Sequence, residues 1–330
     1  MKRPPRTHRV VAVVAVVTLV LPAVLRESAL SVYILLELAA IVTVGVSLLM
    51  GYAGQVSLGQ AAFYASGANA AALLSLHGFP TGIGLLVAPI VAAVFALIVG
   101  IPLLRLRGHH LAFATLATQL IYLSMVGRMH LTGGDIGLQG IPPLTLGPFV
   151  LHADRNYAYL AWAALALVVL ITHNVMTSRP GRALRALATS EVAAESSGVP
   201  VGRYKLAVFA LAAGFAGLAG GIYAFYVGYV APGSFPVLLS FEYVVMAVVG
   251  GLGTIEGALV GAALVTVVVQ SLNQVATLGG MPSYAPIVLS YAAYSGLLIV
   301  AVLFLPQGIV DKERLRALAT RWRARWTTPR

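Results

Sequence analysis

The sequence predicts an all-α fold: a polytopic transmembrane helical bundle with about nine or ten membrane segments, including a broken or re-entrant pair. Of its 330 residues, 59% are hydrophobic and only 9% are charged, whereas an ordinary soluble domain is about 25% charged. A water-facing globule could not bury so much apolar side-chain surface. Several apolar runs also approach or exceed the roughly 20 residues that a helix needs to span a bilayer. These observations exclude a soluble enzyme.

Nine apolar runs account for the predicted segments: 10–25, 30–50, 56–76, 83–104, 111–127, 157–176, 206–228, 242–272 and 285–305. The run 242–272 is too long for one span and contains four glycines between 250 and 257, so we interpret it as two segments joined by a tight turn. The first run follows a basic start and could also be a signal peptide. Residues 22–30 make a poor cleavage site, which favours a retained helix.

The basic residues predict the orientation of these segments. Of the 21 lysines and arginines, all but Arg26, Arg128 and Arg155 fall on one side of the membrane if the broken run crosses twice or re-enters. The positive-inside rule makes that side cytoplasmic and places both termini there. The chain then divides into a transmembrane domain, 1–310, and a basic cytoplasmic tail, 311–330. We expect the tail to lie on anionic lipid and not to bind nucleic acid.

Glycine and polar residues gather in two segments, one in each half of the chain: 51–60 (GYAGQVSLGQ) and 250–257 (GGLGTIEG). Polar side chains at lipid depth face the bundle interior or a wet path, and interrupted helices in both halves are typical of transporter sites. Close packing of helices through glycine is the alternative explanation. The residues predicted to line a translocation path are Gln55, Ser57, Gln60, Gln119, Gly251, Gly253 and Thr254.

Other polar residues in the apolar runs leave two interpretations open. Glu37 is either functional or a carboxyl group near the outer interface. Gln119, Gln270 and Asn273 are each, taken alone, more typical of hydrogen bonds between helices. The two histidines His109 and His110 are expected to belong to a group of basic residues on the cytoplasmic side and not to a metal site.

The motifs that are absent from the sequence also exclude functions. It contains no G-x-x-x-x-G-K-[ST] phosphate loop, no H-E-x-x-H and no G-x-S-x-G. We therefore expect neither an enzyme nor a cofactor-binding protein, and we expect the energy source of any transport to lie in another subunit.

The polar stretch 177–205 predicts a short helical hairpin on the cytoplasmic side. Residues 182–188 favour helix, Ser190 can cap a second helix over 191–197, and Gly198 can end it. A compact projection of this kind is suited to docking into a groove on a partner. A solvated connector is the alternative.

Five stretches in this order resemble the permease subunits of branched-chain amino acid ATP-binding-cassette (ABC) importers, of the LivM type. Segment 51–59 is similar to a G-x-x-G-Q-x-S-x-G signature, and segment 131–137 (LTGGDIG) to a T-G-G-x-x-G outer loop. Segment 250–257 matches G-G-x-G-[ST]-x-x-G. The other two are 107–116 and the hairpin 181–198, with its degenerate E-A-A-x-x-x-G pattern. The resemblance covers roughly residues 30–310.

The resemblance implies an ABC importer permease in a bacterial plasma (inner) membrane. Its partners would be a second permease subunit (LivH-like, or a second copy), two ATPase subunits that bind the ATP, an extracytoplasmic solute-binding protein and membrane lipid. It also implies docking of the hairpin to the ATPase. The residues expected to carry this coupling are Arg182, Arg185, Glu191, Ala193, Ala194 and Gly198.

Some positions depart from the family pattern. The sequence has Ser47 where asparagine is common, Gln60 where histidine is frequent and Gln119 where an acid is frequent, and residues 189–190 replace charged residues. These departures concern the identity of the solute more than the role in transport. Importers of urea or short amides share this architecture and are an alternative. A channel or secondary carrier that needs no ATPase is a second one.

Overall fold

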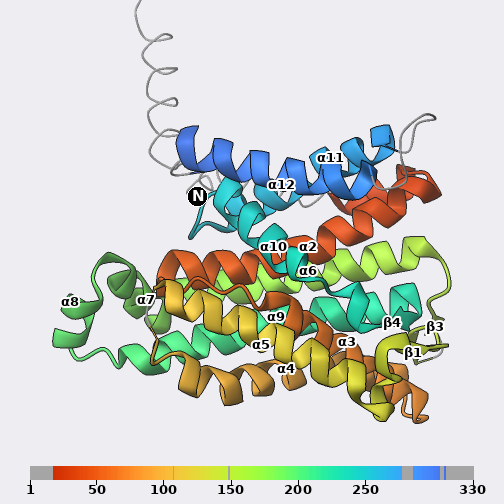
Figure 1. Ribbon diagram of the computed structural model, residues 1–330, viewed down its shortest axis with the longest axis horizontal. Coiled ribbons are helices and arrows are strands. Elements are labelled where there is room, and N and C mark those ends of the chain that lie inside the picture. The colour runs from red at the N-terminus through yellow and green to blue at the C-terminus, as the bar shows by residue number, and fades with distance from the viewer. Residues whose placement is uncertain (1–17, 107, 148, 277–284, 305–307, 310–330) are drawn as a thin grey trace, which may run out of the picture.

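The computed structural model describes residues 18–106, 108–147, 149–276, 285–304 and 308–309 (Figure 1). The basic tail 311–330 and most of the first predicted segment lie outside these residues, although residues 18–24 are helical. The helices are α2 (Glu27–Ala53), α3 (Gln60–Leu76), α4 (Thr81–Leu103), α5 (His109–Arg128), α6 (Asp154–Thr177), α7 (Arg179–Thr189), α8 (Glu191–Ser196), α9 (Val201–Val227), α10 (Val237–Gly250), α11 (Ile255–Ala276) and α12 (Ala285–Phe304).

Apart from the first, which lies mostly outside the described residues, the predicted membrane segments are confirmed as helices, and within the described residues seven helices are long and apolar enough to cross a membrane. The run 242–272 is two helices, α10 and α11, joined by residues 251–254, as the glycines predicted. Three predicted starts are wrong. Helix α9 begins at Val201 and not at 206, and α10 begins at Val237 and not at 242. Helix α3 begins at Gln60 and not at 56, because α2 ends at Gly54, which adopts φ +62°, and the chain stays non-helical through residue 59. The chain is a polytopic, all-helical membrane protein.

Helices α3, α4 and α9 all pack against one another in the interior of the bundle. Most residues of α3 are small and buried. At Gly67 a Cβ atom would lie 2.2 Å from the carbonyl oxygen of Gly217 on α9, so the two helices touch through backbone. Such close contacts replace side-chain interdigitation where membrane helices pack.

The two ends of the bundle differ in structure (Figure 1). Helices α7 and α8 project at one end, which we call the hairpin end. At the opposite end lie two antiparallel strand pairs, β1 (Leu138–Gln139) with β4 (Tyr229–Val230) and β2 (Thr145–Leu146) with β3 (Phe149–Val150). The first pair joins the segment after α5 to the end of α9.

Candidate functional site

The chain between α2 and α3, residues 54–59, is non-helical and runs inside the bundle. Non-helical backbone at membrane depth must find hydrogen-bond partners within the protein. The backbone N–H of Leu58 donates to Thr115 Oγ1 on α5 at 2.9 Å. The backbone N–H of Ala61 donates to Ser240 Oγ on α10, also at 2.9 Å. The Ser240 hydroxyl in turn donates to Gln119 Oε1 at 2.7 Å, so α3, α5 and α10 are joined at one point.

This junction lies near the middle of helix α5, which is long and apolar enough to cross a membrane. Helix α5 has 20 residues, which corresponds to roughly 30 Å, and Gln119 stands about 15 Å from its start. Helix α10 begins at Val237 beside Gln119, so it covers only the part of the bundle toward the hairpin end. Both glycine-rich segments therefore accompany interrupted helices, as is typical of transporter sites.

Three side chains at the start of α3 are buried without hydrogen-bond partners. Gln55, Ser57 and Gln60 are 3%, 1% and 0% exposed. Gln55 Oε1, Ser57 Oγ and both amide atoms of Gln60 have no partner among the described residues. An unsatisfied buried polar group costs about 1–3 kcal/mol. We call these three residues, with Thr115, Gln119 and Ser240, the central polar cluster; its free donors and acceptors are uncharged and can bind a small polar solute or water.

The turn between α10 and α11 is fastened to the end of α2. The backbone N–H of Gly253 donates to Ser47 Oγ at 3.1 Å, and the Tyr52 hydroxyl donates to the carbonyl oxygen of Gly253 at 2.7 Å. Thr254 Oγ1 donates to the carbonyl oxygen of Gly251 at 3.0 Å. A Cβ atom at Gly51 would lie 2.2 Å from the Gly253 nitrogen, so only glycine permits this contact. In contrast to the central polar cluster, the polar groups of this turn have partners.

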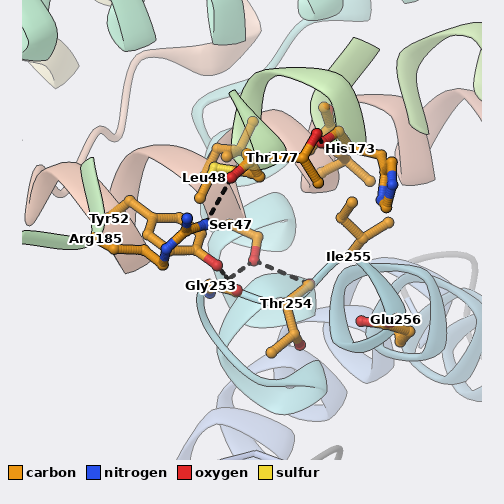
Figure 2. Close-up of a pocket in the computed structure, with 13 residues that line it drawn as sticks. Ser47, Leu48, Tyr52, His173, Thr177, Arg185, Gly253, Thr254, Ile255 and Glu256 are labelled. Atoms are coloured by element: carbon orange, nitrogen blue, oxygen red, sulfur yellow. Dashed lines mark hydrogen bonds between the residues drawn. The ribbon is translucent and has the colours of Figure 1, made fainter. Parts of the chain in front are cut away.

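A pocket of about 270 Å³ opens beside this turn (Figure 2). It lies at the hairpin end, between α2, α6, α7 and the start of α11. Its lining residues are Val44, Ser47, Leu48, Tyr52, Thr172, His173, Met176, Thr177, Arg185, Gly253, Thr254, Ile255 and Glu256.

The predicted hairpin is confirmed as α7 and α8. Ser190 caps α8, since its Oγ accepts from the backbone N–H of Ala193 at 3.2 Å, and Gly198 ends it with φ +80°. Two contacts hold the hairpin to the bundle. Arg185 donates to the carbonyl oxygen of Met176 at 2.6 Å, and Lys205 pairs with Glu191 at 2.7 Å.

The six residues expected to carry coupling do not share one surface. Arg182, Ala193 and Gly198 are exposed, whereas Ala194 is buried. Arg185 and Glu191 are occupied in the two contacts that hold the hairpin. The most prominent apolar side chain on this surface is Val192, which is 78% exposed.

The structure also separates the seven residues predicted to line a path. Gln60 and Gln119 share the central polar cluster with Gln55 and Ser57. Gly251, Gly253 and Thr254 lie at the hairpin end instead, directly after the C-terminal end of α10. Direct contact between the two segments is made by residues 51 and 52 against 253.

Sequence reasoning missed the polar residues that support these sites. Ser240 precedes the apolar run 242–272, and Thr115 lies in the stretch 107–116, but neither hydroxyl was singled out as a site residue. Ser47 differed from the family pattern, but its contact with Gly253 could not be inferred. Thr172 is fully buried in the pocket wall, and its hydroxyl has no partner among the described residues.

The remaining polar candidates have different outcomes. Glu37 is buried within the bundle, and its Oε2 has no partner among the described residues. Gln270 is half-buried on α11. The side chain of Asn273 lies outside the described part of the structure.

Comparison with known proteins identifies the family. Residues 28–305 match the family described as "Branched-chain amino acid transport system / permease component". The chain is 31% identical over 310 residues to the high-affinity branched-chain amino acid transport system permease protein LivM of Escherichia coli (strain K12), covering 86% of this chain and 68% of that protein.

Two further relatives carry similar descriptions. The LivM protein of Salmonella typhimurium is 31% identical over 312 residues, with 86% of this chain and 68% of that protein covered. A probable branched-chain amino acid transport permease protein LivM of Methanocaldococcus jannaschii is 25% identical over 247 residues, which is 70% of each chain. The chain is therefore a member of the permease-component family of branched-chain amino acid transport systems.

Proposed function

We propose that this chain forms the translocation path of an ABC importer for branched-chain amino acids. The observation that carries the proposal is the hairpin α7–α8, which projects from one end of the bundle and exposes an apolar side chain, Val192, that the described residues leave 78% exposed. The names of the relatives support the solute class. In this proposal the chain is a conduit and not an enzyme, and it binds no cofactor.

The proposal includes partners and an orientation. The hairpin end faces the cytoplasm of a bacterial cell, at its plasma (inner) membrane, and both termini lie on that side. Two ATPase subunits bind and hydrolyse ATP there, and a second permease subunit, LivH-like or a second copy, completes the path. An extracytoplasmic solute-binding protein delivers the solute at the opposite end of the bundle, where the two strand pairs lie. Lipid surrounds the bundle, and no nucleic acid is involved.

The central polar cluster is the proposed point of solute contact at mid-membrane. Gln55, Ser57 and Gln60 offer unpaired donors and acceptors there. Gln119 acts through Ser240 as a support, because its Oε1 already accepts a hydrogen bond. The segment 251–254 forms the inner end of the path and transmits movement of the hairpin to α2 through Tyr52.

The coupling role is tested by Val192→Glu. A charge on this apolar surface should lower ATP-driven leucine uptake at least tenfold in proteoliposomes that contain the ATPase subunits and the binding protein. Val192→Ala is the matched control and should keep most of the uptake. Normal uptake by Val192→Glu would contradict docking at this surface. Glu191→Lys is less informative, because it also places a second cation beside Lys205.

The path role is tested by Gln60→Leu, which removes the unpaired amide with little change in volume. Uptake should fall at least tenfold while ATPase binding to the membrane complex is unchanged. Undiminished uptake would place the solute elsewhere.

An importer of urea or short amides is the second candidate. It is favoured by the uncharged donor and acceptor set of the cluster, which matches an amide as well as an amino acid. Competition of leucine uptake by acetamide or urea separates the two. A channel or secondary carrier is the third, and uptake by this chain alone without ATP would favour it.

A further inference from the structure

The pocket at the hairpin end carries two opposite charges on different elements. Arg185 enters it from α7 and Glu256 from the first turn of α11. Among the described residues the one ion pair joins Lys205 to Glu191, so neither Arg185 nor Glu256 is neutralised by a partner. Figure 2 shows them on opposite sides of Thr254.

Arg185 is held in place with donors to spare. One of its terminal nitrogens donates to the carbonyl oxygen of Met176 at 2.6 Å. A guanidinium group has five N–H donors, so the others remain available to a ligand. A guanidinium that is fixed in this way binds a carboxylate through two parallel hydrogen bonds.

The rest of the pocket combines a free hydroxyl with apolar walls. Thr172 lines the pocket and is 0% exposed, and its Oγ1 has no partner among the described residues. Val44 and Leu48 are buried along the α2 side. A ligand with a negative group, a positive group and an apolar part can therefore make a complementary contact with each of these features.

We propose that this pocket is a second solute site, which binds a zwitterionic α-amino acid with an apolar side chain. Arg185 holds the carboxylate, Glu256 the ammonium group, and Thr172 completes the hydrogen bonding, while Val44 and Leu48 contact the side chain. The solute class rests on the proposed function, but the site does not coincide with the central polar cluster. Because Arg185 belongs to the hairpin, an occupied pocket ties α7 to α2, α6 and α11. Solute that accumulates on the hairpin side therefore restrains the hairpin.

The test is calorimetric binding of L-leucine to the purified full-length chain in the Gln60→Leu background, in which the central polar cluster is disabled. Leucine should bind, and two analogues that each lack one charge, 4-methylpentanoate and 3-methylbutylamine, should bind at least tenfold more weakly. Adding Glu256→Gln should weaken the binding of leucine at least tenfold and leave the binding of 4-methylpentanoate unchanged. Adding Thr172→Val should weaken leucine several-fold. The melting temperature of each variant checks that it is folded.

Three outcomes would overturn the proposal. Leucine binding could be absent in the Gln60→Leu background, or it could be insensitive to both Glu256→Gln and Thr172→Val. Glycerophosphoethanolamine could also bind as tightly as leucine, which would make the pocket a lipid headgroup site. The uptake experiments report on the proposed function independently, so the two ideas can fail separately.

Discussion

The segment 54–60 and the turn 251–254 are both rich in glycine and polar residues, but their side chains differ in hydrogen bonding. Around Gln60, polar side chains are buried and unpaired. Around Gly253, the neighbouring hydroxyls of Ser47, Tyr52 and Thr254 all have partners. A glycine-rich, polar segment in a membrane protein can therefore either leave its polar side chains free for a ligand or use its polar groups to bind a neighbouring helix. Composition alone does not distinguish the two.

The difference arises from what each segment lies against. The turn packs directly against the backbone of α2, where the N–H of Gly253 also donates to the carbonyl oxygen of Ser47 at 3.3 Å, so its groups reach partners directly. The segment 54–59 instead satisfies its backbone through side chains of α5 and α10. This arrangement leaves its own side chains without a role in the fold. The predicted losses of stability therefore follow how many contacts or hydrogen bonds each substitution disturbs, and Gln60, whose amide has no partner, comes last.

The largest loss is expected for Gly51→Ala. The added Cβ would lie 2.2 Å from a backbone nitrogen, which cannot rotate away. Overpacking of this kind costs about 1–3 kcal/mol, and we expect the upper end of the range. The melting temperature in detergent measures it. Gly202→Ala is the control, because nothing lies within 4 Å of its Cβ position; equal melting temperatures of the two variants would contradict the close contact.

Ser240→Ala should follow, although it changes only one hydroxyl. It leaves the N–H of Ala61 and the Oε1 of Gln119 unsatisfied in the interior. Each unsatisfied group lowers the free energy of unfolding by about 1–3 kcal/mol, and a water molecule that replaces the lost hydrogen bond would reduce this cost. Thermal unfolding should show a clear decrease, and Ser240→Thr should restore part of it. A melting temperature like that of the unmodified chain would mean that the junction does not support α3.

A smaller loss is expected for Tyr52→Phe, which removes one hydrogen bond to the carbonyl oxygen of Gly253. The turn keeps its contacts with Ser47, so the expected cost is about 1 kcal/mol. The double variant with Ser47→Ala shows whether the contributions of the two hydrogen bonds to stability are additive. A loss as large as that of Gly51→Ala would indicate that the turn depends on Tyr52 alone.

Gln60→Leu should cost almost nothing and could raise stability, because it removes an amide that is buried without partners. Its large effect should fall on uptake only. A loss of stability comparable to that of Ser240→Ala would show that Gln60 is a structural residue, and the contrast between the two regions would disappear.

Much of the fold could be predicted from the sequence because its causes are local. Hydropathy predicted the long helices, and the glycines at 250–257 predicted the break between α10 and α11. The hairpin followed from a cap at Ser190 and a stop at Gly198. The start of α3 was predicted four residues too early, since the predicted helix included part of the polar and glycine segment 54–59, which is non-helical.

The candidate site could be predicted only in part. Gln55, Ser57 and Gln60 are buried in the bundle, and their place in a translocation path stays a prediction. Whether they have partners depends on residues far away in the chain: Ser240 lies 179 positions from Ala61. The pocket between Arg185 and Glu256 brings together charges from α7 and α11, and no spacing in the sequence indicates it.

By itself, then, the sequence determined where the chain crosses the membrane, where helices break and which loop forms a hairpin, because hydropathy, capping and glycine act within a few residues. Only the tertiary structure decided which polar groups are satisfied and which are left for a ligand, because hydrogen bonds between helices depend on distances that are set by packing.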